Sequence, residues 1–257
     1  MKDLSAPEYD AILRSDFWFF AQRCFCQLNP QTTLATNWHL EVIAAKLTAV
    51  REGKIRRLII NVAPRNLKSL LASIAFPAWC LGHDPSAQIL CVSYAQDLAD
   101  KLARDCRSIV MSPWYRQIFP TRLAPHRQAV QEFITTRQGY RLATSTGGAL
   151  TGRGADIILI DDPLKPEEAL SDAQRKAANE WYDHTLYSRL NDKPWRHRDH
   201  HAAAARGRSR RPCARAGGLG GPELSGDRRG RRGAPNRDHL GRAVLPAPSG
   251  PSPASRP

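Results

Sequence analysis

An apolar run that stops at a Lys-Ser pair is the feature that most limits how this 257-residue chain can fold. The run Leu58–Val62 has the composition of a buried strand, and Ala63–Leu67 has that of a short turn. A helical pattern then opens at Lys68-Ser69. This is the layout of a phosphate-binding loop, because unpaired N–H groups and the helix dipole attract an anion. Both glycines of the general pattern G-x-x-x-x-G-K-[ST] are missing, so a plain strand-to-helix turn stays open as the alternative.

Three side chains of the loop would contact a nucleoside triphosphate in distinct ways. Lys68 would reach the β- and γ-phosphates, and the Ser69 hydroxyl would bind Mg²⁺. Arg65 is a second cation, placed to contact the γ-phosphate as an arginine finger does. The predicted nucleotide-binding residues of the loop are Pro64, Arg65, Asn66, Leu67, Lys68 and Ser69.

A second segment supplies acidic groups. Four aliphatic residues, Ile157–Ile160, predict a strand buried on both faces, as in a parallel sheet. The strand ends in Asp161-Asp162, and two carboxylates at such a position are costly unless they meet a cation. Asp161 would hold Mg²⁺, and Asp162 would orient or deprotonate an attacking water. Two acids at a solvated strand end are the alternative, but the combination with the Lys-Ser loop favours an ATPase.

These motifs resemble a known family. The stretch from about Phe17 to Lys193 resembles the N-terminal ATPase domain of the terminase large subunit, the DNA-packaging motor of tailed phages and prophages. The family uses a deviant loop with Pro-Arg ahead of Lys-Ser or Lys-Thr, and it tolerates loss of the usual glycines. Its acidic strand more often ends in Asp-Glu, so Asp162 is one methylene shorter than the usual residue. The segments that carry the resemblance are Leu58–Ser69, Cys91–Ala99, Gly147–Asp156 and Ile158–Pro163.

The resemblance implies a fold, a reaction and partners. The expected fold is α/β, a P-loop NTPase of the RecA-like (ASCE) type, with a mainly parallel sheet in a three-layer sandwich. The expected activity is ATP hydrolysis with Mg²⁺ that moves double-stranded DNA into a procapsid, in the cytoplasm of a host bacterium. Expected partners are the terminase small subunit, the portal and further copies in a ring. The family's adenine contact lies upstream of the first strand, where Trp38-His39 is the candidate and plain helix packing the alternative.

Strands and helices alternate along residues 58–193, which predicts a parallel sheet with helices on both faces. Residues 1–57 form a helical segment leading into this core. The predicted helices are Phe17–Leu28, His39–Val50, Lys68–Cys80, Gln96–Met111 and Ser171–Leu190. The predicted strands are Leu58–Val62, Gln88–Tyr94, Asp156–Asp161 and the hairpin Glu132–Arg137 with Tyr140–Ser145, which turns at Gln138-Gly139.

The glycine-rich loop before the acidic strand has two interpretations. Gly152 and Gly154 flank Arg153, and a turn that needs positive φ would explain the glycines. A loop that senses nucleotide or touches DNA through Arg153 is the other interpretation. The cysteines have no paired zinc spacing, and packed, reduced thiols are expected. The sequence has no signal-peptide core and no stretch suited to crossing a membrane.

Residues 194–257 differ sharply in composition from the rest. This segment contains fourteen Arg against four acidic residues, and it lacks Ile, Phe, Tyr and Lys. Most of the formal net charge of +14 therefore belongs to it. A segment with so few apolar residues cannot bury enough surface to offset the entropy lost on ordering. We therefore expect residues 194–257 to be disordered. One interpretation is an Arg-rich arm that binds nucleic acid.

A frameshift is the second interpretation of this tail. Codons chosen for Asp199–Gly207 allow a reading one base later that gives Ile-Ile-Met-Gln-Arg-Leu-His-Glu, a buried strand followed by a polar motif. A one-base shift near Lys193 would make the tail out-of-frame translation and would remove a sheet strand, the coupling motif and the nuclease. Retained ATP binding with weak turnover is then expected. Another P-loop translocase or helicase, or a non-enzymatic basic protein that binds nucleic acid, are the competing functional hypotheses.

Overall fold

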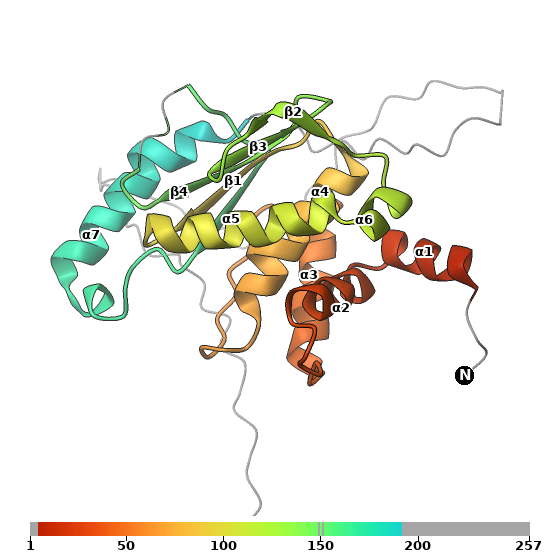
Figure 1. Ribbon diagram of the computed structural model, residues 1–257. Helices are drawn as coiled ribbons and strands as arrows, with labels where there is room; N and C mark the ends of the chain where they lie inside the picture. Colours follow the sequence, from red (N-terminus) through yellow and green to blue (C-terminus); the bar gives the residue numbers. More distant parts are fainter. Residues whose placement is uncertain (1–4, 149, 151, 192–257) are drawn as a thin grey trace, which may run out of the picture. The chain divides into compact units, whose positions relative to one another are not determined.

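A mixed sheet positions the candidate site in the computed structural model, which describes residues 5–148, 150 and 152–191. Among these residues five strands form one sheet in the order β2-β3-β4-β1-β5 (Figure 1). The strands β4, β1 and β5 pair in parallel, whereas β3 pairs antiparallel with β4 and β2 pairs antiparallel with β3. The strands are β1 (Gln88–Ser93), β2 (Leu123–Gln128), β3 (Glu132–Thr135), β4 (Tyr140–Ser145) and β5 (Ile157–Asp161).

Helices cover both faces of the sheet. Successive strand residues point to opposite faces, and in β1 the residues on both faces are apolar and need a covering layer. On one face Ile89 and Cys91 of β1 belong to a large apolar cluster with the helices of the N-terminal half. On the other face Leu90 and Val92 pack with Leu186. The helices are α1 (Ala6–Ser15), α2 (Phe17–Leu28), α3 (Trp38–Arg51), α4 (Phe76–His83), α5 (Gln96–Met111), α6 (Pro113–Ile118) and α7 (Asp172–Trp181).

Four short segments depart from α-helical geometry. The π-helix η1 (Leu70–Ala75) runs directly into α4, so the helix predicted from Lys68 is present but contains a widened turn. The helix predicted over Ser171–Leu190 is also divided. Its parts are α7, the π-helix η3 (Tyr182–Leu186) and the 3₁₀ turn η4 (Tyr187–Arg189); a further 3₁₀ turn, η2 (Glu168–Leu170), precedes α7.

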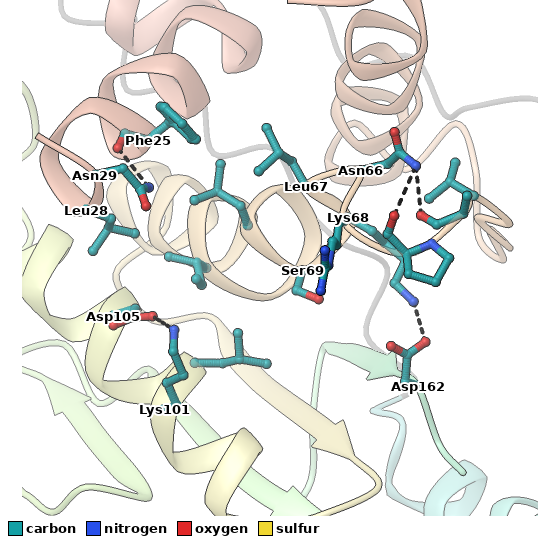
Figure 2. Close-up of a pocket in the computed structure, with 17 residues that line it drawn as sticks. Phe25, Leu28, Asn29, Asn66, Leu67, Lys68, Ser69, Lys101, Asp105 and Asp162 are labelled. Carbon is teal, nitrogen blue, oxygen red and sulfur yellow. Dashed lines mark hydrogen bonds and ion pairs between the residues drawn. The ribbon is translucent and has the colours of Figure 1, made fainter. Parts of the chain in front are cut away.

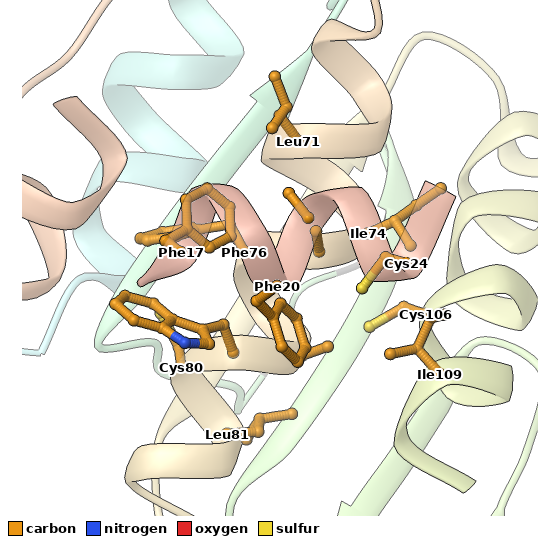
Figure 3. Packing of buried hydrophobic residues seen from close by; sticks show 14 of the residues in the cluster. Phe17, Phe20, Cys24, Leu71, Ile74, Phe76, Cys80, Leu81, Cys106 and Ile109 are labelled. Carbon is orange, nitrogen blue, oxygen red and sulfur yellow. The ribbon is translucent and has the colours of Figure 1, made fainter. Parts of the chain in front are cut away.

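Helix α2 is an integral part of the main core. Phe17 contacts Phe76 and Trp79 with ring centroids 5.7 and 5.2 Å apart. Phe20 and Cys24 continue the same apolar stripe and are fully buried against η1 and α4 (Figure 3). The N-terminal helical segment therefore shares one hydrophobic cluster with the segment that follows the candidate loop.

Most predicted elements are confirmed. The structure has α2 and α5 with the predicted bounds, and α3, β1, β5 and the β3–β4 hairpin differ from prediction by a few residues at their ends. Gln138 has a φ of 65° at the hairpin turn. A Cβ on Gly139 would lie 2.3 Å from the Pro85 carbonyl oxygen, so this turn requires glycine. The sequence reasoning missed α1, α6 and β2.

The predicted strand Leu58–Val62 is wrong: within the described residues this segment has no strand pairing and Ile59 is 70% exposed. A strand forms only where a neighbouring edge is available. One side of β5 pairs with β1, and on the other side Ala155 pairs in parallel with Leu190. This isolated bridge lies just before β5, and Leu58–Val62 joins neither side of it in the described residues.

The C-terminal tail and the prediction about membrane crossing are considered against the residues that the structure describes. The expected disorder, nucleic-acid arm and frameshift of the tail 194–257 concern residues outside those that the structure describes. All described residues fall within one unit, residues 1–203. None of the helices in the described ranges combines the length and apolar character that a membrane crossing needs.

Candidate functional site

The loop between Val62 and Leu70 forms the wall of a cavity of about 590 Å³ (Figure 2). All six predicted nucleotide-binding residues of the loop line it, together with Asp162 from the end of β5. The remaining lining comes from α2, η1 and α5. The lining residues are Phe25, Leu28, Asn29, Val62, Ala63, Pro64, Arg65, Asn66, Leu67, Lys68, Ser69, Leu70, Ile74, Lys101, Leu102, Asp105 and Asp162.

Lys68 joins the loop to the acidic strand. Its ammonium hydrogen-bonds to Asp162 and lies 3.2 Å from Asp161 Oδ1, although 94 residues separate Lys68 from Asp162 in the chain. Burial by itself would lower the pKa of Lys68, but the hydrogen bond to Asp162 and the charge of Asp161 outweigh it and raise the pKa. The lysine is therefore a permanent cation at neutral pH.

The loop is built without glycine, and its backbone shows the consequence. Arg65 and Leu67 have φ values of 65° and 55°, in the left-handed region that costs an L-residue about 1–2 kcal/mol. Asn66 supports the turn because its side-chain amide donates to the Ala63 carbonyl at 2.9 Å. Asp162 also has a left-handed φ of 48°. Backbone strain of this kind clusters at ligand-binding and active sites.

Asp161 is the buried member of the acidic pair. Its residue is 5% exposed, and its Oδ2 accepts a hydrogen bond from Ser73 Oγ at 3.0 Å. Oδ1 is buried as well, and its contact with Lys68 lacks hydrogen-bond geometry, so no donor from the described residues satisfies it. A buried carboxylate oxygen of this kind suits a hard divalent cation such as Mg²⁺.

The described residues contain no cluster of three or more His, Cys, Asp or Glu side chains suited to a metal ion. Mg²⁺ needs no such cluster, because it commonly binds to one or two carboxylates and completes its shell with phosphate oxygens and waters. Ser69 lines the cavity next to Lys68, as a hydroxyl ligand of such an ion must. The residues present therefore fit Mg²⁺ bound together with a phosphate ligand.

Apolar and polar residues of α2 and α5 also line the cavity, and sequence reasoning missed them. Phe25, Leu28 and Asn29 from the C-terminal end of α2 line the cavity, with Leu102 from α5. Lys101 pairs with Asp105 at 2.8 Å along one face of α5. The helix Phe17–Leu28 was predicted, but its contact with the loop joins residues about 40 positions apart in the chain, which no local pattern reveals.

The predicted adenine contact does not line this cavity. Trp38 is 65% exposed at the start of α3, and its ring meets the ring of His39 edge-on with centroids 6.2 Å apart. Neither side chain is among the residues around the loop. The structure therefore brings α2, and not Trp38 and His39, to the wall of the candidate site.

The glycine-rich loop is anchored through its arginine. Arg153 donates to Glu132 at 2.8 Å and lies over the Tyr140 ring at 5.6 Å. Gly152 has a φ of 72°, which agrees with the simpler interpretation of a turn that needs glycine. Arg153 is thus held by β3 and β4 in this conformation and is absent from the residues that line the cavity.

Neither a protein-family model nor a curated protein matches this chain. Functional inference therefore rests on the geometry around Lys68 and on the motifs of the sequence.

Proposed function

We propose that this chain binds and hydrolyses ATP with Mg²⁺ through a P-loop-type site, and that it is the ATPase part of a DNA-packaging terminase. One observation carries the proposal: Lys68, at the start of a helix after the loop, contacts both carboxylates at the end of β5. Lysine at a helix N-terminus provides the cationic contact for the triphosphate, and the paired acids provide the metal and water contacts. The RecA-like arrangement and the terminase assignment rest on the motif resemblance.

Each residue of the site has a distinct role in the proposed reaction. The Lys68 ammonium, now held by Asp162, would turn to the β- and γ-phosphates and leave the carboxylate free to accept a proton from water. Arg65 is exposed in the loop and would approach the γ-phosphate. Mg²⁺, when bound, neutralises phosphate charge and orients the γ-phosphate. Ser69 and Asp161 are the residues that would hold it.

The part of the cavity lined by α2 and α5 is suited to a nucleobase. Phe25, Leu28 and Leu102 offer an apolar surface on which a purine ring can pack. Asn29 donates its amide N–H to the Phe25 carbonyl at 3.2 Å, which leaves its side-chain oxygen as an acceptor. That oxygen could accept from the exocyclic amine of adenine, which guanine lacks at the same position.

Hydrolysis is tested by a single-turnover assay with protein in excess over labelled ATP, because such an assay detects slow chemistry. We expect phosphate release by the wild-type chain and a loss of about 100-fold or more in Asp162→Asn, with ATP binding retained. Asp172→Asn, on an exposed carboxylate of α7, is the matched control and should behave as wild type. Equal rates in Asp162→Asn and wild type would contradict the proposed role of Asp162.

The DNA-directed part of the proposal has its own test. Linear double-stranded DNA added to the same assay should accelerate phosphate release if the chain is a terminase ATPase. Acceleration by single-stranded DNA alone would favour the helicase-type alternative. Phosphate release that neither form of DNA accelerates would contradict the assignment to DNA translocation and leave a P-loop ATPase of another class.

A further inference from the structure

A buried serine links the helix that follows the loop to the metal-binding carboxylate. Ser73 lies in the π-helix η1, is 1% exposed, and donates its hydroxyl to Asp161 Oδ2 at 3.0 Å. Ser73 is four positions beyond Ser69, the expected metal ligand, and the two serines lie on the same side of the helix. The bond fixes one oxygen of Asp161 and leaves Oδ1 on the side of Lys68, 3.2 Å from its ammonium.

Proline explains why the backbone at Ser73 is open to a side-chain donor. In an α-helix the carbonyl of Ser73 would accept from the N–H four residues later, but that residue is Pro77, which has no N–H. The helix widens into η1 just before this proline. Arg141 donates its Nη2 to the Ser73 carbonyl at 3.2 Å and so supplies a side-chain donor where Pro77 has no N–H.

Arg141 occupies an unusual position for a charged residue. It is fully buried on β4, and its Nε and Nη1 have no hydrogen-bond partner within the described residues. A buried cation with incomplete hydrogen bonding is energetically costly. In the described part of the chain the bond to the Ser73 carbonyl is the only hydrogen bond that the Arg141 guanidinium makes, and it therefore indicates the role of this residue.

Ser73 also bridges a gap that Arg141 and Asp161 cannot close directly. Arg141 is paired with Ile89 and Asp161 with Ser93 across β1, on the same face of the sheet. Two strand spacings and four residues of offset place their Cα atoms about 16 Å apart.

We propose that Arg141 and Ser73 are positioning residues for Asp161: Arg141 fixes the Ser73 backbone, and the Ser73 hydroxyl holds the carboxylate so that Oδ1 faces Mg²⁺. This inference rests on the proposed ATPase function and adds a link between β4, the widened helix and the metal ligand. Partners of metal ligands set the orientation of those ligands, and their loss commonly weakens metal binding about 10- to 100-fold. Ser73 and Arg141 touch neither nucleotide nor metal in this scheme.

The test measures ATP binding calorimetrically at a series of Mg²⁺ concentrations and again in excess EDTA. Ser73→Ala should raise the Mg²⁺ concentration for half-maximal ATP binding about tenfold, with metal-free ATP affinity unchanged. Ser73→Thr restores a hydroxyl and should return the Mg²⁺ requirement toward wild type. Ser93→Ala removes another buried hydroxyl, 2% exposed at the C-terminal end of the neighbouring strand β1, and should match wild type.

Pro77→Ala provides a second arm that tests the role of Arg141. Alanine supplies the helical N–H that competes for the Ser73 carbonyl, so the Mg²⁺ requirement should shift in the same direction as in Ser73→Ala. Alanine favours a helix, so folding should survive this change, and a thermal scan checks it.

Four results would overturn the inference or its premise, and each refutes a different part. An unchanged Mg²⁺ requirement in Ser73→Ala refutes the positioning role of Ser73, and an unchanged requirement in Pro77→Ala refutes that of Arg141. Equal losses with Mg²⁺ and in EDTA would mean that Ser73 only supports the fold of the loop. No ATP binding by the wild-type chain under either condition would overturn the proposed function itself, and the positioning role with it.

Discussion

At the scale of single residues, Arg65 and Leu67 have left-handed backbone dihedrals, and Leu67 stands directly before the lysine, where the general phosphate-binding pattern has glycine. Each has a side chain that a glycine would lack. Leu67 packs against the main apolar cluster, and Arg65 adds a cation to the cavity wall. The strain in the backbone is thus the cost of carrying an apolar anchor and a second positive charge in the loop.

Replacement of Arg65 separates strain from function. Arg65→Gly should have a free energy of unfolding about 0.5–1 kcal/mol higher than Arg65→Ala, because glycine relieves the left-handed strain and alanine does not. Both variants should bind ATP more weakly than wild type, since both lose the cation. Urea denaturation and calorimetry provide the two measurements. An alanine variant as stable as the glycine variant would show that Arg65 is not strained.

At the scale of elements, helix α2 serves both the core and the site. Its buried stripe packs on η1 and α4, and its last turn lines the cavity. Asp16 caps the helix by accepting from the N–H of Trp18 at 2.8 Å, which fixes where the helix starts. The position of the proposed nucleobase contact therefore depends on the packing of α2 against the helix after the loop.

Two neighbouring phenylalanines of α2 test this dependence. Phe20 is fully buried, so Phe20→Ala should lower the free energy of unfolding by about 3–5 kcal/mol. Phe19 is 47% exposed in the same helix, and Phe19→Ala should lower it by about 1 kcal/mol or less. Chemical denaturation compares the pair. Similar losses in both variants would mean that α2 does not pack as the structure has it.

The helices could be predicted from the sequence more successfully than the strand expected at Leu58–Val62. Periodic apolar residues and caps are local, so α2 and α5 could be bounded from sequence alone. A strand depends on which edge is free, and pairing of Ala155 with Leu190 is a contact between distant segments. Likewise, Lys68 and the acidic pair stood out in the sequence, whereas the contributions of α2 and Ser73 depend on tertiary packing.

At the scale of the whole molecule, the core contains several buried thiols. Cys24, Cys80, Cys91 and Cys106 are buried, and Cys26 is exposed. Burial raises the pKa of Cys106 to about 12 and raises the pKa values of the other three as well. In the unfolded chain a solvated thiol has its ordinary pKa of 9.0 and ionises earlier, so alkaline pH favours the unfolded chain.

Stability should therefore be full below about pH 9 and should fall as pH rises toward 12, with a limiting slope of about 1.4 kcal/mol per pH unit for each buried thiol. Cys106→Ala should reduce the slope between pH 9 and 10. Denaturation at several pH values measures the slope, and an identical slope in Cys106→Ala would contradict burial of Cys106.

The most direct test of the account is calorimetric titration of the full chain with ATP and Mg²⁺. We expect saturable binding at one site, weakened about 10- to 100-fold in Lys68→Ala through loss of a charge-assisted phosphate contact. Lys46→Ala, on an exposed lysine of α3, should bind as wild type does. Absence of binding by the folded wild-type chain, or equal affinity in Lys68→Ala, would contradict the proposal that this loop is an ATP site.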